Sequence, residues 1–84
     1  MKFYYITVRS VTYAQRAEQL LSRQGFRCSV QRTPRWMEEQ GCGYCVKLWT
    51  DDPAGAMALL REAGVPTRKI YRQGGDGALE EWGI

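Results

Sequence analysis

The chain has 84 residues, of which 44% are hydrophobic and 25% charged, so it can form one small domain with a buried core. Twelve Lys and Arg against nine Asp and Glu give a net charge of +3, which is compatible with a nucleic-acid partner but does not require one. Because there is no histidine, Cys–His dyads and zinc sites that need imidazole are excluded. No apolar run reaches the roughly 18–20 residues of a membrane span. Residues 1–9 are too short and too aromatic for a signal peptide, so we expect a cytoplasmic protein with reduced cysteines.

The first expected elements are a strand and an amphipathic helix. Residues 2–9 are rich in aromatic and β-branched residues and too few for a helix, which predicts a strand. Residues 12–24 carry apolar side chains at intervals of three and four, which predicts a helix with one apolar face. Either Ser10 or Thr12 can cap this helix, and Gly25 stands where a helix commonly ends.

Two strands separated by a loop are expected next. Residues 26–31 and 44–50 alternate between apolar and polar side chains, the pattern of half-buried strands. Residues 33–43 contain a proline near their start and two glycines near their end, which indicates a loop.

A second helix and a fourth strand complete the regular pattern. Asp51 or Asp52 can cap the helix, whose first turn accommodates Pro53 and which ends at Gly64. Residues 67–73 are then expected to form a strand.

This order of elements predicts one domain over residues 1–73, followed by a tail over residues 74–84. The order β-α-β-β-α-β most simply gives an α+β, ferredoxin-like sandwich, in which a four-stranded antiparallel sheet carries two helices on one face. In that topology, the loop over residues 33–43 lies at the end of the sheet where the first helix begins.

Cys42 and Cys45 form a C-x-x-C segment, a spacing compatible with a redox pair, half of a metal site, or chance. Cys42 lies in the loop, where the positive end of the first helix, assisted by Arg9 or Arg35, can stabilise a thiolate. Cys45 has the opposite strand parity to Val46, so we expect it on the sheet face without helices. A disulfide between the two cysteines requires the chain to bend, because extended residues at this spacing are roughly 10 Å apart.

The third cysteine, Cys28, alternates with Phe26 and Val30 and is expected to be a buried apolar residue. Three cysteines without histidine do not supply the four ligands of a structural zinc site within one chain. We therefore expect no metal.

The sheet face without helices combines aromatic and basic side chains, among them Tyr5, Trp49, Tyr71, Arg27 and Lys47. Surfaces of this kind stack bases in RNA-recognition motifs, but no segment matches the glycine–aromatic signature of those motifs. A patch of this kind more often marks an interface. We therefore favour cover by a second subunit, then cover by the tail, and nucleic acid least.

The segment Thr33-Pro34-Arg35, a short polar stretch, and Cys42-Gly43 leading into a strand together resemble the selenium/sulfur carrier-like proteins, a family of short bacterial proteins. The similarity extends over residues 2–72. The resemblance implies a cytoplasmic protein whose Cys42 carries sulfur or selenium as a persulfide or selenopersulfide. It also implies that Thr33, Pro34, Arg35 and Gly43 shape and charge the loop around the carried atom.

The leading hypothesis is thus a carrier, rather than a stand-alone enzyme, that accepts and donates sulfane sulfur at Cys42 without a metal or organic cofactor. Cys45 is a candidate resolving thiol that closes a disulfide. Expected partners are sulfur or selenium donor and acceptor proteins and a second copy bound through the helix-free face, with neither a membrane nor nucleic acid expected. One alternative is a non-catalytic binding or regulatory module that acts through Tyr5, Trp49 and Tyr71. A thiol–disulfide oxidoreductase, which needs a Cys42–Cys45 bridge, is the least favoured.

Overall fold

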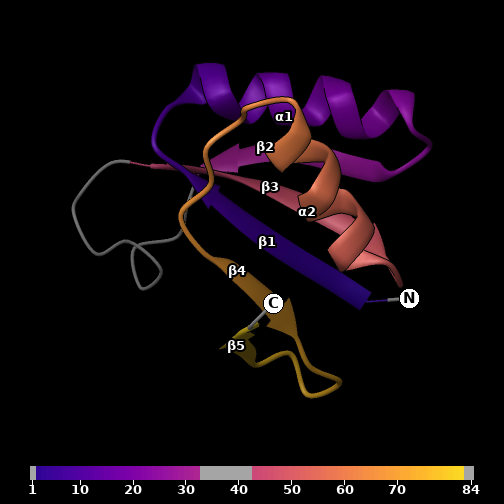
Figure 1. Ribbon diagram of the computed structural model, residues 1–84. Helices are drawn as coiled ribbons and strands as arrows, with labels where there is room; N and C mark the ends of the chain where they lie inside the picture. The colour runs from indigo at the N-terminus through magenta and orange to yellow at the C-terminus, as the bar shows by residue number, and fades with distance from the viewer. Residues whose placement is uncertain (1, 33–42, 83–84) are drawn as a thin grey trace.

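The computed structural model describes residues 2–32 and 43–82, which form an α+β fold with two helices and a five-stranded antiparallel sheet (Figure 1). In chain order, the elements are β1 (Lys2–Val8), α1 (Val11–Arg23), β2 (Arg27–Arg32), β3 (Tyr44–Thr50), α2 (Pro53–Glu62), β4 (Ile70–Gln73) and β5 (Leu79–Glu81).

The strands are arranged in the order β2-β3-β1-β4-β5, with β1 in the centre. β1 pairs with β3 along its whole length, from Lys2 opposite Thr50 to Val8 opposite Tyr44. On its other side, β1 pairs with β4 from Tyr4 to Ile6. The end of β1 therefore lies beside the beginning of β3.

Both helices begin at side-chain caps that the sequence predicted. Ser10 is the N-cap of α1, and its hydroxyl accepts a hydrogen bond from the backbone N–H of Tyr13 at 3.3 Å. Asp52 is the N-cap of α2, and its Oδ1 accepts from the N–H of Gly55 at 3.1 Å. Each side chain satisfies an N–H that the helix itself leaves without a partner, which fixes where the helix begins. After α1, Gly25 adopts a φ of 88°, a left-handed conformation that favours glycine.

The hydrophobic core lies between the two helices and one face of the sheet. α1 contributes Leu21 and two small alanines, α2 contributes Leu60, and the sheet contributes Ile6 and Leu48. These four large side chains are completely buried. The small Ala14 and Ala17 on the inner face of α1 allow the helix to approach the sheet closely.

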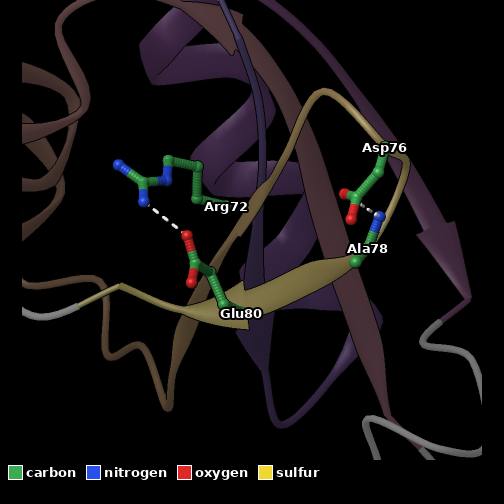
Figure 2. A network of polar contacts seen from close by, with 4 residues as sticks. All are labelled: Arg72, Asp76, Ala78 and Glu80. Atoms are coloured by element: carbon green, nitrogen blue, oxygen red, sulfur yellow. Dashed lines mark hydrogen bonds and ion pairs between the residues drawn. The ribbon is translucent and has the colours of Figure 1, made fainter.

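The prediction of a four-stranded sheet is wrong, because part of the predicted tail forms a fifth strand. β5 pairs with β4 from Tyr71 opposite Glu81 to Gln73 opposite Leu79. The turn between them is a hairpin turn in which Asp76 accepts a hydrogen bond from the N–H of Ala78 at 3.0 Å (Figure 2). The cluster of glycines at residues 74–77 therefore reverses the chain, whereas the sequence analysis took it as the end of regular structure.

Arg72 and Glu80 form an ion pair between β4 and β5, on the same side of the sheet as the helices (Figure 2). Next to β5, the ring of Trp82 packs edge-on against Tyr4, with 5.8 Å between centroids. The N–H of Trp82 also donates to the carbonyl of Ile70 at 2.8 Å. Since Tyr4 belongs to the core, Trp82 packs on the helix side, whereas Gly74, Gly75 and Gly77 of the turn border a hollow beside Phe3 and Trp49.

The fourth strand begins later than predicted, at Ile70 instead of residue 67. Before it, the backbone groups of Arg68 and Lys69 bind Thr7 through irregular hydrogen bonds. The hydroxyl of Thr7 accepts from the N–H of Lys69 at 2.9 Å, which interrupts the regular ladder at this point. Neither of the helices in residues 2–32 and 43–82 is long and apolar enough to cross a membrane.

Candidate functional site

The predicted site is built around the loop that connects β2 to β3. Cys42, Thr33, Pro34 and Arg35 lie outside the described residues. Gly43 is described; it is buried and directly precedes β3. The position of Gly43 therefore locates the point at which Cys42 is joined to the folded domain.

The ends of three strands meet where Gly43 enters the sheet. Tyr44, the first residue of β3, lies opposite Arg32 at the end of β2 and opposite Val8 at the end of β1. The chain then passes from β1 into α1 through Ser10, the helix cap. The start of α1 and the start of β3 consequently lie at the same end of the molecule (Figure 1).

Basic side chains gather at this end among the described residues. Arg9 directly follows β1, and Arg32 is the last residue of β2. Arg68 lies beside the same end of β1, because its backbone N–H donates to the carbonyl of Thr7. The side chains of all three arginines are exposed. The first turn of α1 contains no acidic residue, so its positive end is not neutralised from within the helix. One acidic side chain, Glu62 at the end of α2, lies on this side. Three further carboxylates follow β3 and β4 at the opposite end: Asp51, Asp52 and Asp76.

Cys45 is not a surface residue, contrary to the sequence expectation. Its register opposite Thr7 and Gln31 places it on the helix-free side of the sheet, as its parity predicts. Yet its side chain is 0% exposed, and Thr7 beside it is also buried. Alternation determines the side of the sheet on which a side chain lies, but it does not determine how much of that side is covered. A fully buried thiol is not accessible to an external sulfur donor.

Cys28 packs against the core, as predicted, but remains partly exposed because β2 is an edge strand. Its sulfur lies 3.6 Å from the hydroxyl of Ser22 and donates to the carbonyl of Glu18, also at 3.6 Å. Burial raises the pKa of the Cys28 thiol; the hydrogen bond with Ser22 opposes this, and the charge of Glu18 adds to it. The protonated form is therefore favoured, which makes Cys28 a poor nucleophile.

The two described cysteines, Cys28 and Cys45, do not form a disulfide with each other. In the part of the chain that the structure describes, no three Cys, Asp or Glu side chains gather as a group of metal ligands.

The three residues predicted for the helix-free face lie there together. Tyr5 is opposite Tyr71 in the sheet, and Trp49 is opposite Phe3. The rings of Phe3 and Trp49 are in contact, with centroids 4.4 Å apart and planes tilted by 49°. The ammonium group of Lys47 lies over the Phe3 ring at 4.3 Å and 5.9 Å from the Tyr5 ring. These aromatic rings thus share one face of the sheet, and the positively charged side chain of Lys47 lies over two of them.

Comparison with known proteins agrees with the resemblance noted in the sequence. A family model described as "Putative Se/S carrier protein-like" matches residues 3–72. The searches of curated proteins and of solved structures gave no match. The matched segment contains both helices, β1 to β3 and most of β4. Because it covers well over half of the 84 residues, the chain belongs to the Se/S carrier protein-like family.

Proposed function

We propose that this protein is a sulfur or selenium carrier that uses Cys42 to accept and donate the transferred atom. Membership of the Se/S carrier family supports the class of function. The observation that carries the choice of residue is the position of Gly43, which is bonded to Cys42 and buried at the cationic end of the sheet, where α1 begins.

The charges at this end suit sulfur chemistry. A thiolate, and the persulfide formed from it, are anions that the positive end of a helix and nearby guanidinium groups stabilise. Arg9 and Arg32 supply such groups from the ends of β1 and β2. In this proposal, Thr33, Pro34 and Arg35 complete the surroundings of the sulfur, with Arg35 adding a further positive charge. The same charges attract an anionic persulfide donor.

The proposed transfer proceeds in two balanced steps. The Cys42 thiolate attacks the outer sulfur of a donor persulfide, R–S–SH; the donor S–S bond breaks, a new S–S bond forms at Cys42, and R–S⁻ leaves. An acceptor thiolate then attacks the outer sulfur of the Cys42 persulfide, and the Cys42 thiolate leaves. The transferred sulfur keeps its oxidation state throughout, so no external oxidant is needed. Selenium takes the place of the outer sulfur in the same scheme.

Cys45 serves as the resolving thiol in this scheme. Its burial keeps it from competing with Cys42 for an external donor. When it attacks the inner sulfur of the Cys42 persulfide, a Cys42–Cys45 disulfide forms and hydrosulfide leaves, which balances the reaction without an oxidant. We expect Cys45→Ala to retain the persulfide for longer after loading.

The rest of the assignment follows from this proposal. We place the carrier in the cytoplasm, with sulfur or selenium donor and acceptor proteins as partners. We also propose that the domain is ferredoxin-like. The observed element order and the neighbours β2-β3-β1-β4 support this topology, with β5 added at one edge.

The test is persulfide transfer followed by mass spectrometry of the peptides. After incubation with a low-molecular-weight persulfide, we expect the mass of one sulfur atom to be added to the Cys42 peptide. Cys42→Ser should abolish the addition, whereas the matched variant Cys28→Ser should retain it. Labelling that persists in folded Cys42→Ser would contradict the proposal.

A further inference from the structure

The helix-free face contains a hollow at the edge strand β2. The hollow has a volume of about 590 Å³; it is lined on the helix-free face by Phe3, Arg27, Ser29, Gln31, Lys47 and Trp49, and it extends around the edge of β2 to Ser22, Phe26 and Cys28. Trp49 lies near the end of β3 that is remote from Gly43. The Trp49 side of the hollow is therefore remote from Gly43, whereas its Gln31 side, opposite Cys45, is nearer to Gly43.

Trp49 is the aromatic residue of this surface that lines all three of its hollows. One side of its ring contacts Phe3, yet the residue also lines two neighbouring hollows of about 500 and 410 Å³. Its half-buried ring is thus open to solvent from more than one direction. An indole held against another ring and still accessible is suited to stacking a flat heterocycle.

The charges and polar groups of the hollow point to an anionic ligand. Arg27 and Lys47 contribute two cations, and none of the described residues that line it is acidic. Ser29 and Gln31 add exposed hydrogen-bonding side chains in alternate positions of β2, next to the cations. Aromatic rings, cations and sugar-binding polar groups on an open sheet are the combination that recognises single-stranded RNA.

We propose that this hollow binds a short segment of single-stranded RNA. One base stacks on Trp49, the phosphates contact Arg27 and Lys47, and Ser29 and Gln31 hydrogen-bond the ribose 2′-hydroxyl groups. The hydroxyl contacts are the reason for choosing RNA over DNA.

A second copy of the chain fits this surface less well, although the sequence analysis favoured it. In a two-fold interface the same patch meets itself, so Arg27 and Lys47 would approach other cations. Two described carboxylates lie beside this patch, Asp51 and Asp52, which line a neighbouring hollow together with Arg27 and Trp49; Asp52 is engaged as the cap of α2. A third, Glu81, lies on β5 at the far side of the sheet. Trp82, the large apolar side chain of the tail, does not serve as a cover either, because it packs on the helix side.

The test measures binding of a fluorescently labelled single-stranded RNA to the full chain by anisotropy, at low and at physiological salt. We expect Trp49→Leu to weaken binding by roughly five- to a hundredfold, the usual effect of losing one stacked base. Arg27→Gln and Lys47→Gln should each weaken it about three- to tenfold and reduce its salt dependence. Because these two changes affect surface cations, they test the site even where Trp49→Leu lowers stability.

Matched controls lie on α1, where Arg16 and Tyr13 are exposed. Arg16→Gln removes the same charge as Arg27→Gln, and Tyr13→Leu removes an exposed ring; both should leave the affinity unchanged. Cys42→Ser should also bind RNA normally, which separates this proposal from the carrier function. Absence of RNA binding at low salt would overturn the proposal, and so would equal affinity for single-stranded DNA. It would also be overturned if the α1 control variants lost as much RNA affinity as the variants of the hollow, or if a concentration-dependent dimer formed through this face and excluded RNA.

Discussion

At the scale of single residues, the two cysteines that the structure describes have different chemical environments although they are the same amino acid. Cys28 is partly exposed but protonated, because burial raises its pKa. Cys45 is fully buried. Cys42 is joined through Gly43 to the cationic end of the sheet. The burial of Cys45, the raised pKa of Cys28 and the cations near Gly43 therefore favour Cys42 as the acceptor in the proposed transfer, while the other two act as packing or secondary thiols.

The state of Cys28 gives a prediction about pH. A thiol whose pKa is raised on folding stabilises the folded protein at pH values below the pKa of an ordinary thiol, about 8.5. This stabilisation is lost as the pH rises through the pKa that the thiol has in the folded protein. The difference in unfolding free energy between the wild type and Cys28→Ala should therefore narrow between about pH 8 and about pH 10. Urea unfolding across this range measures it, and a difference that widens with pH would contradict the account.

At the scale of elements, the helix caps decide where each helix begins. Two adjacent aspartates precede α2, and the structure distinguishes between them, because Asp52 receives the N–H of Gly55. Asp52→Ala should lower the free energy of unfolding by about 1 kcal/mol, the usual loss for a capping side chain. The neighbouring Asp51→Ala removes the same charge without the cap and should have little effect on the urea midpoint. Equal effects of the two changes would show that charge, and not capping, is what matters.

The elements also show how much of the fold follows from sequence. Both helices and the first three strands were predicted to within one or two residues, because the period of their apolar side chains matches their structure. β5 was missed because Leu79–Glu81 is short and has one apolar residue, so its pairing depends on β4. The late start of β4 also depends on a neighbouring strand, because the N–H of Lys69 donates to the Thr7 hydroxyl of β1 in place of a regular backbone hydrogen bond between the strands.

The candidate sites were predictable to different degrees. The aromatic and basic side chains of the helix-free face follow from strand parity, and their register confirms that they share one face. The burial of Cys45 did not follow from parity, because it depends on the three-dimensional surroundings of one end of the sheet. The hollow beside Trp49 was also missed, since it lies where side chains from β1, β2 and β3 meet at an edge.

At the scale of the whole molecule, the two faces of the sheet have different roles. One face holds the core and, at its edge, Trp82 packed against Tyr4. The other face carries the aromatic and cationic surface. The fifth strand extends the sheet at the edge opposite β2, which contributes Arg27, Ser29 and Gln31 to the proposed RNA site.

The packing of the C-terminal segment gives a prediction at this scale. Trp82→Ala should lower the free energy of unfolding by about 2 kcal/mol, because a half-buried indole loses its contact with the core. The exposed neighbour Glu81 provides a control, since Glu81→Ala leaves that contact intact. Thermal unfolding of the two variants measures the difference, and an unchanged midpoint for Trp82→Ala would show that the segment adds nothing to the fold.

The central claim is that Cys42 both accepts and releases a sulfane sulfur, and a complete transfer cycle tests it most directly. The protein is loaded with a low-molecular-weight persulfide, freed of the donor, and treated with cyanide, which attacks the outer sulfur and leaves as thiocyanate. We predict about one equivalent of thiocyanate per chain for Cys45→Ala, which lacks the resolving thiol, a smaller amount for the wild type and for Cys28→Ser, and none for Cys42→Ser. Thiocyanate released in equal amount by folded Cys42→Ser would contradict the account, and so would a Cys45→Ala protein that releases none.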